Sequence, residues 1–375
     1  MSAAFDTVDH GILLERLEKT HGIKNSALRW IKSYLTDRTQ TVVVHDIRSS
    51  TKQLVRGVPQ GSVLGPVLFL LYTTEIQNII RSFGLEAHVY ADDNQLYFHA
   101  APAEVSSIER RFVTCIQAIN QWMSSNRLKL NPDKTEFIWI SSQYHARLIQ
   151  QNAITIGNAA VTPVQCARDL GVQLSSTLTL KNHVSSIVKS CFYQLRQLKY
   201  VKRSLNKENM KTLLHAFVTS RLDYCNSLLA NQPTTLIARL QSVQNAAARL
   251  FAGVSSRSHV TSILRDELHW LRIPQRIDYK ICMLVYNCLY GGAPSYLSQY
   301  CARLQDSSTR LSRNRSAALK NLIVPRTRTK THGQRSFAFT GPSTWNLLPT
   351  QLKQNLPYCA FKSQLKTHFF KTCYD

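Results

Sequence analysis

A chain of 375 residues with 44% hydrophobic content can bury a core, which favours a folded protein of two or three domains over an intrinsically disordered one. The formal net charge of +24 is unevenly distributed, because residues 1–183 carry 18 Lys and Arg against 15 Asp and Glu, whereas residues 184–375 carry 28 against 7. A basic half beside a near-neutral half indicates a polyanionic partner such as a nucleic acid, with a basic surface kept for solubility as the alternative.

The first part of the chain predicts helix, paired strands and helix in that order. Apolar residues recur at helical spacing over 11–36, and two short strands, 41–44 and 53–55, flank a polar turn over 46–51. The longest apolar run, 63–72, is typical of a buried helix. It is too short to cross a membrane, so we expect no transmembrane helix.

The tetrapeptide Tyr90-Ala91-Asp92-Asp93 lies between two runs of strand-forming residues, 87–90 and 96–98, and predicts a β-hairpin with acidic residues at its tip. Hard divalent cations prefer carboxylate oxygens, and nucleotidyl transfer uses two such ions about 4 Å apart. A tight turn can hold two carboxylates at that separation. Considered alone, the pair is equally compatible with an ordinary Asp-Asp turn.

A long amphipathic helix over 103–130 and a strand over 137–140 are predicted to follow the hairpin. This order of elements suits an α+β fold in which an antiparallel sheet carries helices on one face. Beyond Leu180 the pattern is helical. The predicted helices there are 181–203, 206–229, 234–252, 258–268 and 275–290, with Gly253, Pro274 and Gly291-Gly292 as breakers.

Residues 302–335 carry nine Lys and Arg against the single Asp306, and predict either a disordered basic linker or an arm that contacts nucleic acid. The last segment is apolar enough to dock back onto the fold, through Phe337, Phe339, Trp345, Leu347, Leu348 and Phe361. Nine scattered cysteines without a Cys-x-x-Cys pair argue against a zinc knuckle and indicate reduced thiols inside the cell, in nucleus or cytoplasm, rather than a secreted protein.

Several motifs surround the acidic hairpin in a fixed order. They are Ser-Ala-Ala-Phe-Asp-Thr-Val-Asp-His at 2–10, Arg-Gly-Val-Pro-Gln-Gly-Ser at 56–62, Asn-Arg-Leu-Lys-Leu-Asn-Pro-Asp-Lys-Thr-Glu at 126–136 and Arg-Asp-Leu-Gly-Val at 168–172. In this order and spacing they resemble the palm of the reverse transcriptase of non-LTR retrotransposons of the jockey-like type. Segments at 225–229, 244–250, 268–273, 293–297, 325–330 and 361–368 resemble the region that follows the polymerase in those elements, so the resemblance covers essentially the whole chain.

The resemblance implies an RNA-directed DNA polymerase with a partial right-hand palm over residues 1–160, without fingers, and a palm–thumb connection over 161–183. A helical, basic thumb-like region over 184–300 and a basic arm with a C-terminal segment over 301–375 would follow. The implied partners are an RNA template, a DNA primer and deoxynucleoside triphosphates, with no membrane, and the implied cofactor is Mg²⁺ in a two-metal site. The sequence leaves the oligomeric state open.

The resemblance also assigns roles to single residues. Asp92 and Asp93 would bind the metal ions, Gln60 would contact the incoming nucleotide, and Gly61 would let the backbone approach it. Phe5 matches the aromatic residue that lies under the sugar and selects deoxynucleotides. Lys134 matches the lysine near the leaving pyrophosphate, as charge stabiliser or general acid. A core aromatic and a solvated lysine are the alternatives for Phe5 and Lys134.

One departure from the family pattern bears on activity. The first palm motif of the family reads Asp-Leu-Ser-x-Ala-Phe, and aligning Phe5 with it puts the family's third metal-binding aspartate one residue before Met1. Asp6 and Asp9 follow Phe5, and we expect neither to replace it. We therefore expect a truncated polymerase with little or no activity on its own. A non-catalytic nucleic-acid-binding remnant, or an inert chain without a stable fold, are the alternatives.

Overall fold

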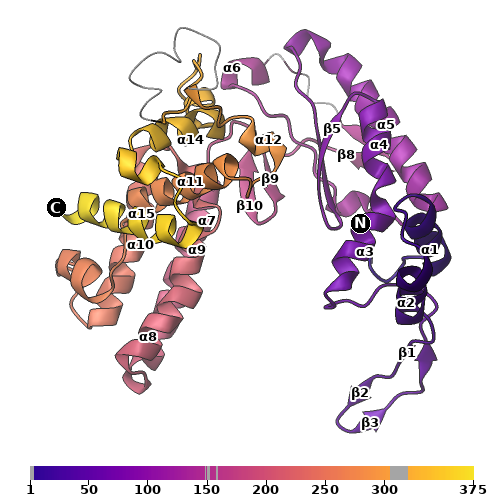
Figure 1. Ribbon diagram of the computed structural model, residues 1–375, viewed down its shortest axis with the longest axis horizontal. Coiled ribbons are helices and arrows are strands. Elements are labelled where there is room, and N and C mark those ends of the chain that lie inside the picture. The colour runs from indigo at the N-terminus through magenta and orange to yellow at the C-terminus, as the bar shows by residue number, and fades with distance from the viewer. Residues whose placement is uncertain (1–3, 148, 150–152, 158, 305–319) are drawn as a thin grey trace. The chain divides into compact units, whose positions relative to one another are not determined.

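The computed structural model describes residues 4–147, 149, 153–157, 159–304 and 320–375, and it is an α+β structure (Figure 1). The chain divides into two compact units, residues 1–167 (unit 1) and residues 168–375 (unit 2). Each unit has its own core of buried hydrophobic side chains.

The helices of unit 1 carry most of its core. They are α1 (His10–Lys19), α2 (Asn25–Leu35), α3 (Leu64–Thr73), α4 (Glu75–Ser82), α5 (Val105–Ser125) and α6 (Gln143–Ala146), with 3-10 turns at Pro102–Glu104 and Pro132–Lys134. The helical region predicted over 11–36 forms α1 and α2, because Gly22 adopts a φ of 69° between them. The predicted long helix is α5, whose Ile108, Ile119 and Met123 are buried.

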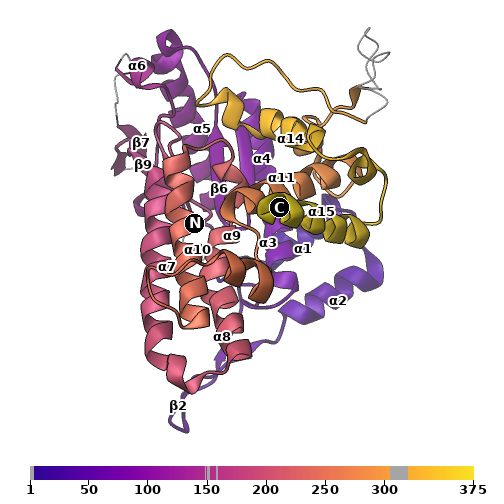
Figure 2. The same cartoon turned by 90° about the vertical axis from the view of Figure 1, so that its left-hand side faces the viewer.

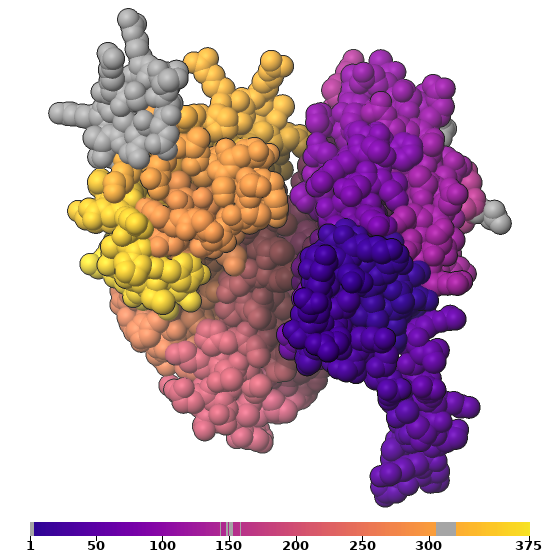
Figure 3. Space-filling view, turned by 45° about the vertical axis from the view of Figure 1, so that its right-hand side comes forward, coloured from indigo at the N-terminus to yellow at the C-terminus, as the bar shows by residue number. Residues whose placement is uncertain are grey.

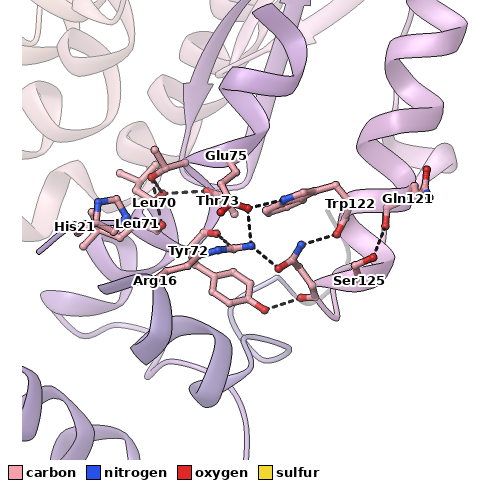
Figure 4. A network of polar contacts seen from close by, with 12 residues as sticks. Arg16, His21, Leu70, Leu71, Tyr72, Thr73, Glu75, Gln121, Trp122 and Ser125 are labelled. Carbon is pink, nitrogen blue, oxygen red and sulfur yellow. Dashed lines mark hydrogen bonds and ion pairs between the residues drawn. The ribbon is translucent and has the colours of Figure 1, made fainter. Parts of the chain in front are cut away.

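A polar network joins α1, α3, α4 and α5 (Figure 4). The guanidinium of Arg16 donates to the carbonyl oxygen of Tyr72, to Oε2 of Glu75 at 2.7 Å and to Oδ1 of Asn126 at 2.6 Å. It also lies over the rings of Tyr72 and Trp122, 5.1 and 5.0 Å from their centroids. Each helix therefore contributes a partner to one nearly buried cation, which fixes how the helices pack.

The strands of unit 1 form separate antiparallel pairs. They are β1 (Thr39–Gln40) with β4 (Lys52–Gln53), β2 (Val43–Val44) with β3 (Ile47–Arg48), β5 (Glu86–Tyr90) with β6 (Asp93–Tyr97), and β7 (Ile154–Ile156) with β8 (Ala159–Val161). The next strand along the chain, β9 (Cys166–Asp169), pairs with β10 (Val172–Ser175). The prediction of one antiparallel sheet was wrong for the described residues, because these short strands meet only their hairpin partners.

Two strand predictions need correction. The turn predicted over 46–51 lies earlier, at His45 and Asp46, whose φ values of 46° and 65° suit a two-residue hairpin turn. The resulting β1–β4 arm is exposed and projects from the rest of unit 1 (Figures 1 and 3). The strand predicted over 137–140 is only a single bridge, from Phe137 to Pro163. One backbone hydrogen bond accompanies this bridge, from the N–H of Val164 to the carbonyl of Phe137 at 2.7 Å, and the rings of Phe137 and Trp139 pack edge to face on each other.

Unit 2 is mainly helical, as predicted. Its helices are α7 (Lys181–Val201), α8 (Lys207–Leu214), α9 (Ser220–Asp223), α10 (Thr234–Ala252), α11 (Ile273–Leu289), α12 (Ser295–Ser298), α14 (Phe337–Asn346) and α15 (Tyr358–Tyr374). Short 3-10 turns lie at Lys202–Ser204, Asn226–Leu229, Gly333–Arg335 and Thr350–Lys353. Five-residue π turns lie at His215–Thr219, between α8 and α9, and at Ile263–Glu267. The helix predicted over 206–229 is therefore continuous over 207–223, with a π turn in its middle, and it ends at Tyr224, whose extended ψ of 120° breaks it before the 3-10 turn.

The core of unit 2 forms where α7 and α10 lie side by side (Figure 2) and where α11 packs against α14 and α15. Trp345, Phe361 and Leu365 are almost fully buried there, which confirms that the last segment docks back. Leu347 is an exception, because it is 84% exposed. An ion pair also ties α9 to α11, with Arg276 Nη1 2.6 Å from Asp223 Oδ2.

The segment 302–335 is described only at its two ends, and its residues 305–319 lie outside the described part. At those ends Arg303 bridges to Leu322, with Leu304 N–H donating to the Asn321 carbonyl at 3.1 Å. The N–H of Leu322 also donates to Oδ1 of Asn346 at 2.8 Å, which attaches this part of the segment to α14. Within the described residues, no helix has both the length and the apolar character that crossing a membrane requires.

Candidate active site

The predicted acidic hairpin is present in unit 1. β5 and β6 pair in register from Glu86–Tyr97 to Tyr90–Asp93, so that Ala91 and Asp92 form a two-residue turn. Ala91 takes a φ of 52°, a left-handed conformation that is unfavourable for a residue with a Cβ. Asp92 is half-buried at this turn, and Asp93 is exposed beside it.

Side chains alternate between the two faces of the hairpin, and the contacts of each face fix the position of the turn. Ala87 and Leu96 are paired across the strands and pack against the core cluster of unit 1. On the other face, the hydroxyl of Tyr97 lies 3.1 Å from Nε2 of His88. One face is therefore anchored, and the turn presents its two carboxylates at the end of a fixed hairpin.

The segment around Phe5 is bonded to the Gly-Val-Pro-Gln-Gly loop. The N–H of Val58 donates to the carbonyl of Phe5, and the N–H of Gly57 donates to the carbonyl of Val8, both at 2.8 Å. Gly57 has a φ of 86°, and a Cβ there would lie 3.0 Å from the Cα of Asp6. This glycine therefore lets the loop approach another part of the chain, rather than a ligand.

Two predicted site residues, Gln60 and Phe5, lie where the segment around Phe5 is bonded to the Gly-Val-Pro-Gln-Gly loop. Nε2 of Gln60 donates to Oδ1 of Asp6 at 2.9 Å, on the exposed side of the loop. The ring of Phe5 is half-buried and stacks on Phe69 of α3, with centroids 4.9 Å apart. Gly61, with a φ of 75°, has open space where a Cβ would point, so a ligand can approach its backbone.

Lys134 lies at the end of the 3-10 turn Pro132–Lys134, with its side chain exposed. The side chain of Asn131 begins this turn by accepting from the N–H of Asp133 at 3.1 Å. Among the described residues, no hydrogen bond or ion pair joins Lys134 to Asp92 or Asp93. The structure thus links Phe5 with Gln60, and it anchors Phe5 and the hairpin on one core, but it does not bring Lys134 into contact with them.

The turn carboxylates are compatible with Mg²⁺, which commonly takes one or two protein carboxylates together with water and substrate phosphates. Within the described part of the chain, no group of three or more His, Cys, Asp or Glu side chains gathers to hold a metal ion. The other nearby aspartates have partners. Asp9 caps α1 by accepting from the N–H of Gly11 at 2.9 Å, and Asp6 accepts from Gln60.

Sequence reasoning missed the role of Asp6 in holding Gln60. The two residues are 54 positions apart, and no local pattern signals a contact over that separation. It also missed a basic cavity in unit 2, lined in part by Arg249, Arg257 and Arg272. The cluster could have been suspected only from three arginines placed around the helix breaker Gly253.

Comparison with known proteins places the hairpin within a matched region. Residues 1–200 match the family described as reverse transcriptase (RNA-dependent DNA polymerase). The chain is 28% identical over 222 residues to the probable RNA-directed DNA polymerase from transposon BS of Drosophila melanogaster, covering 57% of this chain and 23% of that one.

Two further relatives are similar over more of the chain. The RNA-directed DNA polymerase from mobile element jockey of Drosophila funebris is 24% identical over 336 residues, which is 87% of this chain and 34% of the relative. The probable RNA-directed DNA polymerase from transposon X-element of Drosophila melanogaster is 26% identical over 273 residues, 70% of this chain and 29% of the relative. The chain thus spans between 23% and 34% of the length of these relatives.

Proposed function

The chain belongs to the reverse transcriptase family, in its jockey-like non-LTR branch, and on this premise we propose that its acidic hairpin serves RNA-directed DNA synthesis. The observation that carries the proposal is the two-residue turn that presents Asp92 and Asp93 within the matched region. The proposed substrates are deoxynucleoside triphosphates, and the proposed partners are an RNA template and a DNA primer, acting inside the cell in nucleus or cytoplasm.

In the proposed site, Asp92 and Asp93 would hold Mg²⁺. Bound there, the metal would activate the attacking oxygen and stabilise the leaving oxygen of the phosphoryl transfer. Gln60 would donate its amide to the incoming nucleotide through the second N–H of Nε2, while Asp6 accepts the first and orients the side chain. The ring of Phe5, which stacks on Phe69, would form a flat surface against the sugar.

Lys134 would supply positive charge to the leaving group, and its exposed side chain is free to extend toward a bound triphosphate. We assign the palm to residues 1–160, the connection to 161–183, the thumb-like region to 184–300 and the arm to 301–375. The boundary between the two compact units, at 167 and 168, supports this assignment because it falls in the proposed connection.

For these 375 residues on their own we propose little or no synthesis. Asp92 lies in the hairpin turn and Asp93 is the first residue of β6, so neighbouring residues of a single hairpin would supply both carboxylates. A two-metal site depends on ligands that hold both ions in place while charge moves between the attacking and leaving oxygens. The second candidate function, nucleic-acid binding without catalysis, is favoured by the charge of unit 2, where 30 Lys and Arg stand against 8 Asp and Glu over residues 168–375.

Primer extension on an RNA template with Mg²⁺ or Mn²⁺ tests the proposal, using the chain, its Asp92→Asn variant and Asp37→Asn as a matched control. Asp37 is an exposed aspartate with a φ of 57°, a conformation that Asn also tolerates, so its substitution removes one charge without strain. Incorporation that only Asp92→Asn abolishes would place catalysis at the hairpin and refute the proposal of low activity. Incorporation that survives Asp92→Asn would refute the hairpin as the site.

We expect no incorporation from these residues on their own, and binding to RNA that weakens as salt rises would then support the nucleic-acid partner. Absence of RNA binding would refute the non-catalytic function.

A further inference from the structure

A basic cavity of about 270 Å³ lies within unit 2, against the second half of α10 and the loop that follows it. Arg249 lines it from α10, Arg257 and His259 from the loop, and Arg272 from the residue before α11. No acidic side chain lines the cavity. Asp266 and Glu267, which lie close in sequence, are already paired with Arg265 and Lys207.

The end of α10 explains how Arg249 is positioned. Gly253 terminates the helix with a φ of 74°, and its N–H donates to the carbonyl of Arg249 at 2.9 Å. The chain then turns back, so that Nε of Arg249 donates to the carbonyl of Ser258 at 3.0 Å. That bond orients the half-buried guanidinium, and its two Nη groups have no protein partner in the described part of the chain.

The remaining lining residues also present donors. Nη2 of Arg272 donates to Oγ1 of Thr261 at 3.1 Å, and the guanidinium also lies over the ring of Tyr374, 5.7 Å from its centroid, which orients it. Oδ1 of Asn245 accepts from Gln241 at 2.8 Å, which leaves the Nδ2 amine of Asn245 as a donor. Arg257 is exposed and makes no hydrogen bond or ion pair within the described residues.

Three guanidinium groups and an amide amine, without a carboxylate, form a site for an anion. The planar donors of arginine match the oxygens of phosphate and of carboxylate, and the nucleic-acid partner proposed above favours phosphate here. The volume is several times the roughly 30 Å³ that one water molecule occupies, so a phosphate would leave space for an attached sugar or base.

We propose that this cavity binds a backbone phosphate of a nucleic-acid strand together with its adjoining nucleotide. The inference rests on the nucleic-acid partner proposed above, and it adds a specific contact in unit 2, apart from the acidic hairpin of unit 1. A free nucleotide offers the same phosphate chemistry, so the experiment must separate the two sources.

The test measures binding of a fluorescently labelled single-stranded RNA by anisotropy, with the full chain at several salt concentrations. Arg249→Gln and Arg257→Gln remove one charge each from the cavity. Arg196→Gln, an exposed arginine of α7 outside the cavity, removes one charge as a control. Arg257→Gln breaks no described hydrogen bond, so a loss of binding in that variant does not reflect lost folding.

Each cavity variant should weaken binding about tenfold, the loss of one charge-assisted contact. It should also make the salt dependence shallower by about 0.7 in the logarithmic slope for each phosphate lost. The control should change binding less than about twofold. Equal effects of the cavity and control variants, with the wild-type chain still binding RNA, would overturn the cavity proposal alone.

Adenosine monophosphate is the free-nucleotide probe, measured by calorimetry. If the cavity variants lose affinity for adenosine monophosphate but keep their affinity for RNA, the cavity serves a free nucleotide and the proposal fails. If the wild-type chain does not bind RNA at all, the nucleic-acid partner of the proposed function fails, and this inference fails with it.

Discussion

Among the side chains outside the apolar core of unit 1, Arg16 is the one whose removal should lower the stability of that unit most. Its side chain is 11% exposed and supplies hydrogen bonds to α3, α4 and the end of α5. Substitution by Met keeps the apolar stem and removes the charge. The carbonyl of Tyr72 and the amide oxygen of Asn126 would then each lose a donor.

The magnitude follows from burial. Breaking a buried ion pair by removing one partner costs about 3–5 kcal/mol, because the other charge stays buried. Glu75 is 41% exposed and keeps a hydrogen bond from Nε1 of Trp122 at 2.8 Å, so water can restore part of the loss. We therefore expect the free energy of unfolding of unit 1 to fall by about 3 kcal/mol, which corresponds to roughly 6–12 °C in melting temperature.

Because the chain has two units, a local probe is needed, and hydrogen exchange read by mass spectrometry supplies it. Peptides from α1, α4 and α5 should lose protection in Arg16→Met, while peptides from α7 and α10 should not change. The control is Lys19→Met on the same helix, whose exposed pair with Glu15 should contribute nothing measurable. Equal protection of the two variants would refute the assignment of Arg16 as the link between these helices.

Two further predictions concern titration and packing. Burial raises the pKa of Asp278, on α11, to about 6, against about 3.9 in an unfolded chain. Between these values the folded state holds the proton that the unfolded state has lost, so the stability of unit 2 should fall as pH rises from about 4 to 6 and stay lower above it. Asp278→Asn should remove this fall and stabilise the protein at neutral pH by about 2–3 kcal/mol. Urea unfolding midpoints measured at pH 4.5 and 7.5 check this. The same change in midpoint between the two pH values in the wild-type chain and in the variant would contradict it. In unit 1, a Cβ at Gly65 would lie 2.7 Å from the carbonyl oxygen of Pro59. Gly65→Ala should therefore displace the loop that carries Gln60 and lower the free energy of unfolding by about 1–3 kcal/mol, which thermal melts would detect as a lower melting temperature. An unchanged melting temperature would show that the loop adjusts without cost.

Periodic patterns predicted the long elements well. α5, α7 and α10 carry apolar residues at helical spacing over 19 or more residues, and each forms close to its predicted bounds. The acidic hairpin was also predictable, because turn residues separate two short strand-like runs. The local sequence was sufficient to predict an element where apolar residues recurred at a regular spacing or where turn residues separated two strands.

Contacts between distant segments were not predictable from pattern. A four-residue apolar run such as 137–140 does not reveal whether a distant segment will pair with it, and here only Phe137 forms a bridge, to Pro163. The bonds from Gln60 to Asp6 and from Arg249 to Ser258 depend on how loops fold back. The sequence therefore supplied most residues of the candidate site, but not the junction that holds Gln60 nor the basic cavity.

The π turn between α8 and α9 keeps the apolar side chains of this helix on the side that faces the core. Met210, Leu214, Val218 and Leu222 are all buried and are spaced four residues apart. In a uniform α-helix each four-residue step overshoots a turn by about 0.4 residue, so such a stripe would wind away from the core. The wider turn at His215–Thr219 absorbs this excess and keeps the stripe on one side. Shortening that turn by one residue would rotate Asp223 away from Arg276 and so uncouple α9 from α11.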